Sequence, residues 1–258
     1  EMRPGDWSSD VCSSDLFSYP NGEEAVLKNI DFSCHKGQKI AVIGSTGSGK
    51  STLVKLMNRF YDVSRGSIEI NGVDIRKYYL ESLRTQIGYV AQKAHMFKGS
   101  IQSNICFGKP EASVEEMVHA ATVAQASDFI STREHGYEDE IAEDGTNISG
   151  GQKQRLSIAR VILKKPSLYI YDDSFSALDF KTDAILRKAL KPEVKNAIFF
   201  VVAQRISTIM DSDMIIVLDE GQIIGMGTHV QLLKDCSVYQ EIAHSQLTQK
   251  ELDDYERN

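Results

Sequence analysis

The residues of this sequence that could do chemistry begin with a glycine-rich loop. The apolar run 40–43 precedes the loop and predicts a buried strand, and the run 53–57 after it predicts a helix. Strand, glycine-rich loop, Gly-Lys-Ser and helix form the context in which a loop cradles phosphate. The loop consists of Gly44, Ser45, Thr46, Gly47, Ser48, Gly49, Lys50, Ser51 and Thr52. The sequence therefore predicts a nucleoside-triphosphate site, the alternative being an ordinary glycine-rich turn.

Each part of this loop has a physical task. Glycines let the backbone curl so that successive N–H groups face an anion. The helix N-terminus adds unpaired N–H groups and the positive end of its dipole. We expect Lys50 to contact the β- and γ-phosphates and the Ser51 hydroxyl to ligate Mg²⁺.

Two further segments could complete a nucleotide site. The run 168–171 predicts a strand that ends in Asp172, a carboxylate that could hold Mg²⁺ through water. A second segment opens a helix with small residues that allow close backbone approach, and its N-terminus favours phosphate. That segment is Ser149, Gly150, Gly151 and Gln152. In isolation, either feature could equally be an ordinary strand end or a capped helix start.

The elements that must position these residues follow an α/β pattern. Between residues 93 and 159 strand signals vanish and amphipathic helical segments such as 114–126 appear. The pattern predicts a helical subdomain, 93–159, inserted into an α/β core, 17–92 and 160–258. Other helices are expected over 80–85, 153–163 and 179–190, with two more at the C-terminal end. Other strands are expected over 17–22, 27–33, 66–72, 87–90, 197–202, 214–218 and 222–224. The strand over 66–72 is closed by Asn71 and Gly72, an Asn-Gly pair that indicates a hairpin turn.

Composition narrows the class of protein. The 258 residues carry a formal net charge of −7, which argues against nucleic acid as a partner because phosphate backbones require Lys and Arg. The longest apolar runs, such as 197–203, are far shorter than the roughly 20 residues that span a bilayer, so we expect no membrane crossing. The four cysteines have no metal-ligand spacing and indicate a reducing compartment.

Residues 1–16 do not fit this pattern. They are rich in Ser and Asp and lack periodicity, as expected of a disordered linker. The string DWSSDVCSSDL is also the translation of a nucleotide sequence that resembles a sequencing-library adapter. We expect this second origin and exclude the segment from fold reasoning. The natural chain would then have continued upstream.

Taken in order, these motifs resemble the ATP-binding cassette family, in particular the nucleotide-binding domain of exporter-type transporters. The resemblance covers residues 17–246. It implies an α/β P-loop NTPase fold with a RecA-like core, an antiparallel β subdomain and an inserted α-helical signature subdomain. Six motifs carry it: Tyr19, the loop 44–52 (Walker A), Gln92, the segment 143–145, the signature 148–152 and the segment 176–179.

The resemblance also implies roles for these residues. Tyr19 would stack on the adenine of ATP, although it could also be an ordinary packing tyrosine. Gln92 would reach Mg²⁺ and the attacking water, and Asp172 would bind Mg²⁺. The segment 143–145 would touch membrane-domain helices. The family forms head-to-tail dimers, in which each ATP lies between one subunit's phosphate loop and the other subunit's signature.

Two positions depart from the family pattern, and both would be catalytic. The family has a Glu that polarises the attacking water where this chain has Asp173, whose shorter side chain withdraws the carboxylate. The family has a switch histidine that contacts the γ-phosphate where this chain has Gln204. Glutamine can form hydrogen bonds but cannot carry a positive charge.

This pair of departures predicts the degenerate half of a heterodimeric exporter. Such a half binds ATP and Mg²⁺ but hydrolyses ATP slowly, and its signature completes the partner's site. Its partners would be a second nucleotide-binding domain and the exporter's transmembrane domains, at the cytoplasmic face of the plasma (inner) membrane. The alternatives are a homodimeric exporter domain with ordinary ATPase activity and a regulatory module with negligible turnover.

Overall fold

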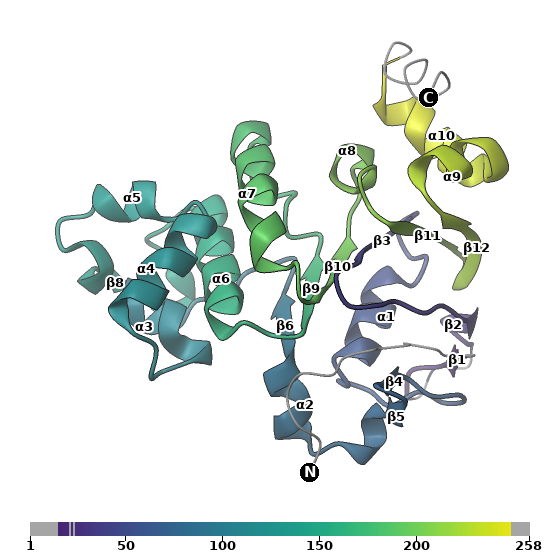
Figure 1. The fold of residues 1–258 in the computed structure, drawn as a ribbon, viewed down its shortest axis with the longest axis horizontal. Coiled ribbons are helices and arrows are strands. Elements are labelled where there is room, and N and C mark those ends of the chain that lie inside the picture. Colours follow the sequence, from purple (N-terminus) through teal and green to yellow (C-terminus); the bar gives the residue numbers. More distant parts are fainter. Residues whose placement is uncertain (1–14, 21, 23, 249–258) are drawn as a thin grey trace. The chain divides into compact units, whose positions relative to one another are not determined.

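The computed structural model describes residues 15–20, 22 and 24–248, which form two compact units (Figure 1). Unit 1 draws on Glu1–Arg84 and Ile198–Asn258, and unit 2 is Thr85–Ala197. These limits differ from the predicted limits of the core and the helical subdomain, and that division stays a prediction. Of the segment 1–16, only the last two residues are described; the rest lies outside the described residues.

Four neighbouring strands form the centre of unit 1. Its strand β3 (Lys39–Gly44) lies between β10 (Ile198–Val202) and β11 (Met214–Asp219) and is parallel to both. The strand β12 (Gln222–Gly227) pairs antiparallel with β11. Ile40 to Ile43 are at most 1% exposed, as expected of a parallel strand covered on both faces. The strand that leads into the glycine-rich loop is therefore fixed at the centre of a sheet.

Unit 1 also contains two short pairs of antiparallel strands. β1 (Asp15–Phe17) pairs with β2 (Leu27–Ile30). The strand predicted over 27–33 is too long, because its partner β1 has only three residues and the ladder ends at Ile30. β4 (Glu69–Ile70) and β5 (Val73–Asp74) form a hairpin, so only two residues of the strand predicted over 66–72 pair.

The hairpin turn itself follows its predicted chemistry. Asn71 and Gly72 have φ values of 55° and 70°. Two consecutive positive φ values are what a two-residue hairpin turn of the favoured twist requires, and Asn-Gly meets that requirement at low cost. The Asn-Gly dipeptide therefore set the hairpin where the sequence predicted it.

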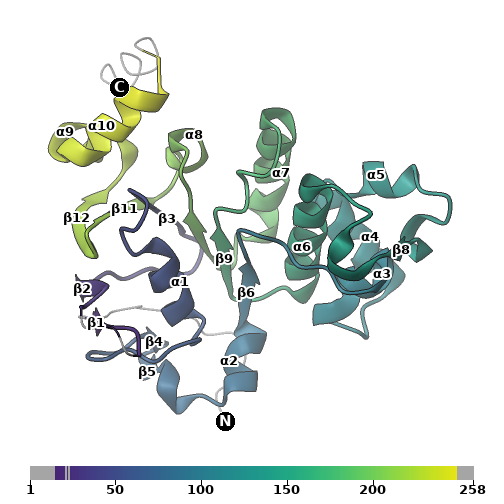
Figure 2. The same ribbon diagram turned by 180° about the vertical axis from the view of Figure 1, so that it is seen from behind.

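The helices of unit 1 surround these strands. The pair α9 and α10 packs side by side at the C-terminal end of the described chain (Figure 2). A capping box between Thr228 and Gln231 begins α9. The bounds are α1 Lys50–Met57, the 3₁₀ helix η1 Ile75–Lys77, α8 Ile206–Ile209, α9 His229–Asp235 and α10 Ser237–Gln246; α2, Leu80–Gln86, leads into unit 2.

Unit 2 contains two pairs of strands. β6 (Ile87–Val90) runs parallel to β9 (Leu168–Asp172), with Val90 opposite Tyr171. A second pair, β7 (Gly99–Ser100) with β8 (Glu140–Ile141), lies in the region where we expected no strands. That expectation is wrong because two-residue strands are too short to show alternation in the sequence.

The helix α6 is central to the helical part of unit 2. It packs against α3 and α4, and its residues Leu156, Ile158 and Ala159 are fully buried (Figure 1). This packing fixes the helix that the signature opens. The helices of unit 2 are α3 Ile101–Ile105, η2 Cys106–Gly108, α4 Val114–Val123, α5 Ser127–Ser131, η3 Gly136–Glu138, η4 Glu143–Gly145, α6 Gly150–Lys164 and α7 Phe180–Glu193.

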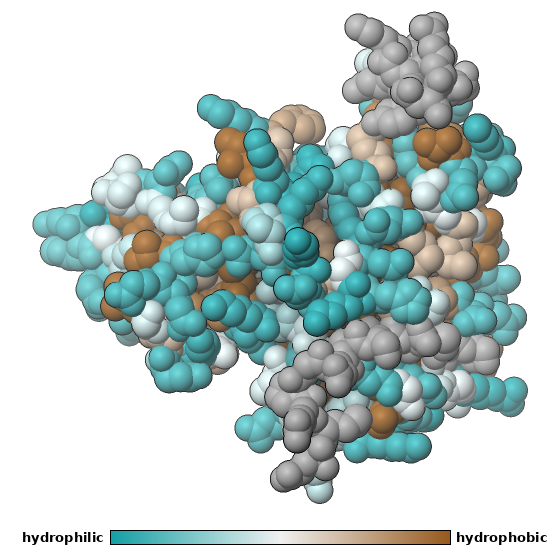
Figure 3. All heavy atoms as spheres, in the orientation of Figure 1, coloured by the Kyte–Doolittle hydropathy of each residue, from teal (hydrophilic) through white to brown (hydrophobic). Residues whose placement is uncertain are grey.

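Hydrophilic side chains predominate on the face drawn in Figure 3, with hydrophobic patches among them. Within the described part of the chain, no helix is both long and apolar enough to cross a membrane.

Candidate nucleotide-binding site

The glycine-rich loop leads directly into an uncapped helix. Gly49 is the N-cap of α1 with a φ of 104°, and no described side chain caps the helix. Gly47 has a φ of 87°, so both positions use the left-handed backbone that glycine adopts without strain. No described side chain therefore caps the start of α1, as an anion site at a helix N-terminus requires.

Lys50 folds back over the loop that precedes it. Its Nζ donates to the carbonyl oxygens of Gly44 at 2.9 Å and Ser45 at 2.6 Å, and lies 3.3 Å from the Ser48 hydroxyl. The Ser45 hydroxyl in turn donates to Asp219 at the end of β11, at 3.2 Å. These bonds close the loop into a compact cradle with the lysine ammonium at its rim. A triphosphate would present stronger acceptors to that ammonium than neutral carbonyls do.

Tyr19 is joined to the helix that follows this loop. Its hydroxyl lies 3.0 Å from the Thr52 hydroxyl, and the Lys55 ammonium lies 5.7 Å from the centre of its ring. Thr52 is buried, so it gives the tyrosine a fixed anchor. The aromatic side chain expected to meet adenine is thus tied to α1, which also carries Lys50.

Gln204 follows β10 and belongs to the same unit as the loop. Its side chain is exposed, while its backbone is held by Gln246 at the end of α10. The Gln246 side chain donates to the Gln204 carbonyl and accepts from the Ile206 N–H, both at 2.8 Å. This amide clamp fixes the turn that presents Gln204.

In unit 2, Asp172 closes the buried strand β9. It is 7% exposed, and the Tyr89 hydroxyl on β6 lies 3.4 Å from its Oδ2. Burial, and secondly the charge of Asp172, raises the pKa of Tyr89 to about 12. The tyrosine therefore stays protonated at neutral pH and can donate to the carboxylate. A buried carboxylate oriented in this way is a suitable oxygen donor for a hard cation such as Mg²⁺.

Asp173 and Gln92 contact each other directly. The Gln92 amide donates from Nε2 to Asp173 Oδ2 at 3.1 Å. Asp173 is buried and has a φ of 48°, a left-handed conformation that Asp tolerates better than most residues. The backbone thus accommodates Asp at this position, and its carboxylate is engaged by the glutamine.

The signature segment begins α6 with a complete capping box. Ser149 Oγ accepts from the Gln152 N–H at 3.2 Å, and Gln152 Oε1 accepts from the Ser149 N–H at 3.0 Å. A side chain on Gly151 would meet the Ala177 carbonyl at 3.4 Å, so the segment 176–179 approaches the helix start closely. Farther along α6, buried Gln154 donates to the Ala91 carbonyl at 3.1 Å. The signature helix therefore also holds the loop that carries Gln92.

The predicted residues thus form two groups, one within each unit. Unit 1 holds Tyr19, the loop 44–52 and Gln204, and unit 2 holds Gln92, Asp172, Asp173 and the signature. Two residues that contact these groups, Tyr89 and Gln246, are not among the predicted site residues. Tyr89 lies three residues before Gln92 and could have been noticed, but no local pattern marks Gln246, whose partner Gln204 is 42 residues away.

Known proteins are similar in sequence to this chain over most of its length. The family model described as ABC transporter matches residues 27–176. An uncharacterized ABC transporter ATP-binding protein of Mycobacterium bovis is 44% identical over 233 residues, which is 89% of this chain and 40% of that protein. The protein YgaD of Bacillus subtilis, named as a candidate multidrug export ATP-binding/permease protein, is 44% identical over 88% of this chain and 39% of its own.

A solved structure shows the same fold. It is described as a bacterial Atm1-family ABC exporter with ATP bound, and it is 35% identical with a TM-score of 0.91. The match covers 95% of this chain and 43% of the solved one. The chain therefore spans about 40% of the length of the curated relatives it matches.

Proposed function

The chain belongs to the ABC transporter family, whose ATP-binding domains are ATPases, and on that premise we propose that it powers export across a membrane. It has the α/β P-loop NTPase fold of this family. The name of the similar protein YgaD combines ATP-binding with permease, and this chain would likewise act together with transmembrane domains of an exporter. The domain would then work at the cytoplasmic face of the plasma (inner) membrane.

We propose that this chain binds ATP together with Mg²⁺. Lys50 and the N–H groups of the loop 44–52 would hold the phosphates, and Tyr19 would stack on the adenine. Ser51, Asp172 and Gln92 would be the oxygen ligands of Mg²⁺. Two features support this assignment. The start of α1, which no described side chain caps, suits the phosphate anion. The buried and oriented carboxylate of Asp172 suits a hard cation such as Mg²⁺.

We propose that this site hydrolyses ATP slowly. The observation that carries the proposal is the contact between Gln92 and Asp173. It fixes a carboxylate that is one methylene shorter than the glutamate of the family, so the oxygen would fall short of the attacking water. General-base catalysis depends first on this geometry. Gln204 adds to the deficit because it cannot bring positive charge to the γ-phosphate.

The signature segment would give the chain a second role. Its signature, Ser149, Gly150, Gly151 and Gln152, is intact and begins a well-capped helix. We propose that it completes the ATP site of a second, catalytically competent nucleotide-binding domain in a heterodimer. The helical subdomain 93–159 would present it, inserted into the core 17–92 and 160–258.

The test measures binding and turnover in the same preparation. The chain alone should bind ATP with Mg²⁺ and hydrolyse it at least about tenfold more slowly than a competent cassette, because general-base catalysis contributes about 10²–10⁴-fold. Adding a second cassette from the same source, with Glu and His at the two positions, should raise turnover strongly. Turnover by the chain alone at the rate of a competent cassette would contradict the proposal.

A further inference from the structure

We propose that Tyr61 is a positioning residue for the base of the bound nucleotide, because it braces the ring of Tyr19. The inference rests on the proposed function, which places the base on Tyr19. Tyr61 follows α1, 42 residues after Tyr19 in the chain, and none of the motifs described above includes it.

Tyr61 belongs to a cluster of three aromatic rings in unit 1. Its ring centre lies 5.2 Å from that of Tyr19 at an interplanar angle of 89°. Phe17 contacts both rings, at 5.0 Å from Tyr19 and 5.9 Å from Tyr61. The two contacts of the Tyr19 ring are edge-to-face, an arrangement that is favourable at these distances. Phe17 is 2% exposed and Tyr61 is 37% exposed, so the cluster is anchored in the core and reaches the surface at Tyr61.

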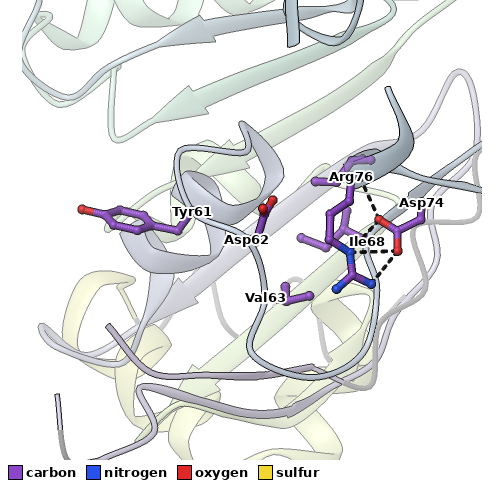
Figure 4. A pocket seen from close by; sticks show the side chains of 7 residues that line it. Tyr61, Asp62, Val63, Ile68, Asp74 and Arg76 are labelled. Carbon is purple, nitrogen blue, oxygen red and sulfur yellow. Dashed lines mark hydrogen bonds and ion pairs between the residues drawn. The ribbon is translucent and has the colours of Figure 1, made fainter. Parts of the chain in front are cut away.

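Tyr61 is itself held in place by the segment around it. Arg59, which has a left-handed φ of 50°, donates to the carbonyls of Ile75 and Tyr78, both at 2.9 Å. Figure 4 shows the Tyr61 ring directed away from the hollow that contains the Arg76 ion pair. The backbone at Tyr61 is thus fixed from one side, and its ring is free to contact Tyr19 on the other.

The hydrogen bond between the Tyr19 and Thr52 hydroxyls links the aromatic cluster to the helix of the phosphate loop. Thr52 lies on α1, two residues after Lys50. The ring for the base and the ammonium for the phosphates are therefore attached to one helix, at a fixed spacing. Tyr61 supports the ring from the side, which limits its motion before the nucleotide arrives. Such preorganisation strengthens binding by lowering the ordering cost.

The experiment compares ATP with inorganic tripolyphosphate, which has the phosphates but no base. Binding to the full chain is measured by calorimetry or by competition with a fluorescent nucleotide. Tyr61→Ala should weaken ATP binding about 2- to 12-fold, the value of one aromatic pair, and leave tripolyphosphate binding unchanged. Tyr61→Phe should restore the affinity for ATP. Tyr79→Ala is the matched control, since Tyr79 is 87% exposed in the same unit.

Two results would overturn the inference. Unchanged ATP affinity in Tyr61→Ala would mean that the ring of Tyr19 needs no support, and equal weakening of both ligands would mean that the phosphate loop is distorted. If the alanine variant does not fold, Tyr61→Leu replaces it in the same comparison, because leucine keeps most of the side-chain volume but has no ring. Lys50→Ala tests the proposed function separately: if it binds both ligands normally, the phosphate site is wrong whatever Tyr61 does.

Discussion

The signature serine provides the most informative single substitution, because its structural and catalytic effects can be separated. Ser149→Ala removes the hydroxyl that accepts from the Gln152 N–H at 3.2 Å. Loss of such a helix cap costs about 1 kcal/mol of stability. If the hydroxyl also donates to the partner's γ-phosphate, the variant loses a hydrogen bond to a charged group, worth about 1.5–3 kcal/mol. That loss predicts about 10- to 150-fold slower turnover in the heterodimer.

The chain supplies a matched control in a second capping box. Ser113 begins α4 with the same arrangement, in which its Oγ accepts from the Glu116 N–H at 3.2 Å and its own N–H donates to Glu116 Oε2 at 3.2 Å. Ser113→Ala should therefore lower the free energy of unfolding by the same 1 kcal/mol or so. It should leave turnover of the heterodimer unchanged, since α4 carries no signature residue.

The assay has two parts, urea unfolding of each variant alone and steady-state ATP turnover of each variant mixed with the partner. We expect equal stability losses and a turnover loss in Ser149→Ala only. Unreduced turnover in both variants would refute the claim that the signature serves the partner's ATP. Equally reduced turnover in both would show that the loss reflects stability and not contact with phosphate.

Three further predictions follow from single contacts. Tyr89→Phe should raise the Mg²⁺ concentration needed for half-maximal ATP binding about 10- to 100-fold, because Asp172 loses a hydrogen-bond donor that helps to orient it. Burial lowers the pKa of His229, which is hydrogen-bonded to Tyr239. As pH drops below about 6.5 the unfolded state is protonated before the folded state, so the free energy of unfolding should fall. His229→Gln should flatten this pH dependence in urea unfolding. Gly221→Ala should lower the free energy of unfolding, measured in urea, by more than about 1 kcal/mol, because φ is 77° and the new Cβ would lie 2.1 Å from a carbonyl oxygen.

The parts of the fold that the sequence predicted well are those with local causes. The strand into the loop at 44–52, the turn at Asn71 and Gly72, and the helix start at Ser149 each depend on residues that are neighbours in the chain. Apolar runs, turn residues and caps act over a few positions, so a single sequence records them.

The parts that the sequence did not predict depend on distant contacts. The bond between Tyr89 and Asp172 joins residues 83 apart, and the Gln246 clamp reaches back to Gln204 across 42. Hydroxyl and amide groups of this kind have many possible partners, and only the tertiary fold selects one. The ring contact between Tyr61 and Tyr19 is a similar case, because the two residues lie 42 positions apart in the chain.

The central claim is that Asp173 and Gln204 limit hydrolysis at a site that otherwise binds ATP soundly. The most direct measurement is single-turnover hydrolysis by the double variant Asp173→Glu with Gln204→His, beside the unmodified chain and a triple variant that adds Lys50→Ala. We expect at least about tenfold faster hydrolysis in the double variant, nearly unchanged ATP affinity, and loss of the gain in the triple variant. A folded double variant that binds ATP but hydrolyses it no faster would contradict the account.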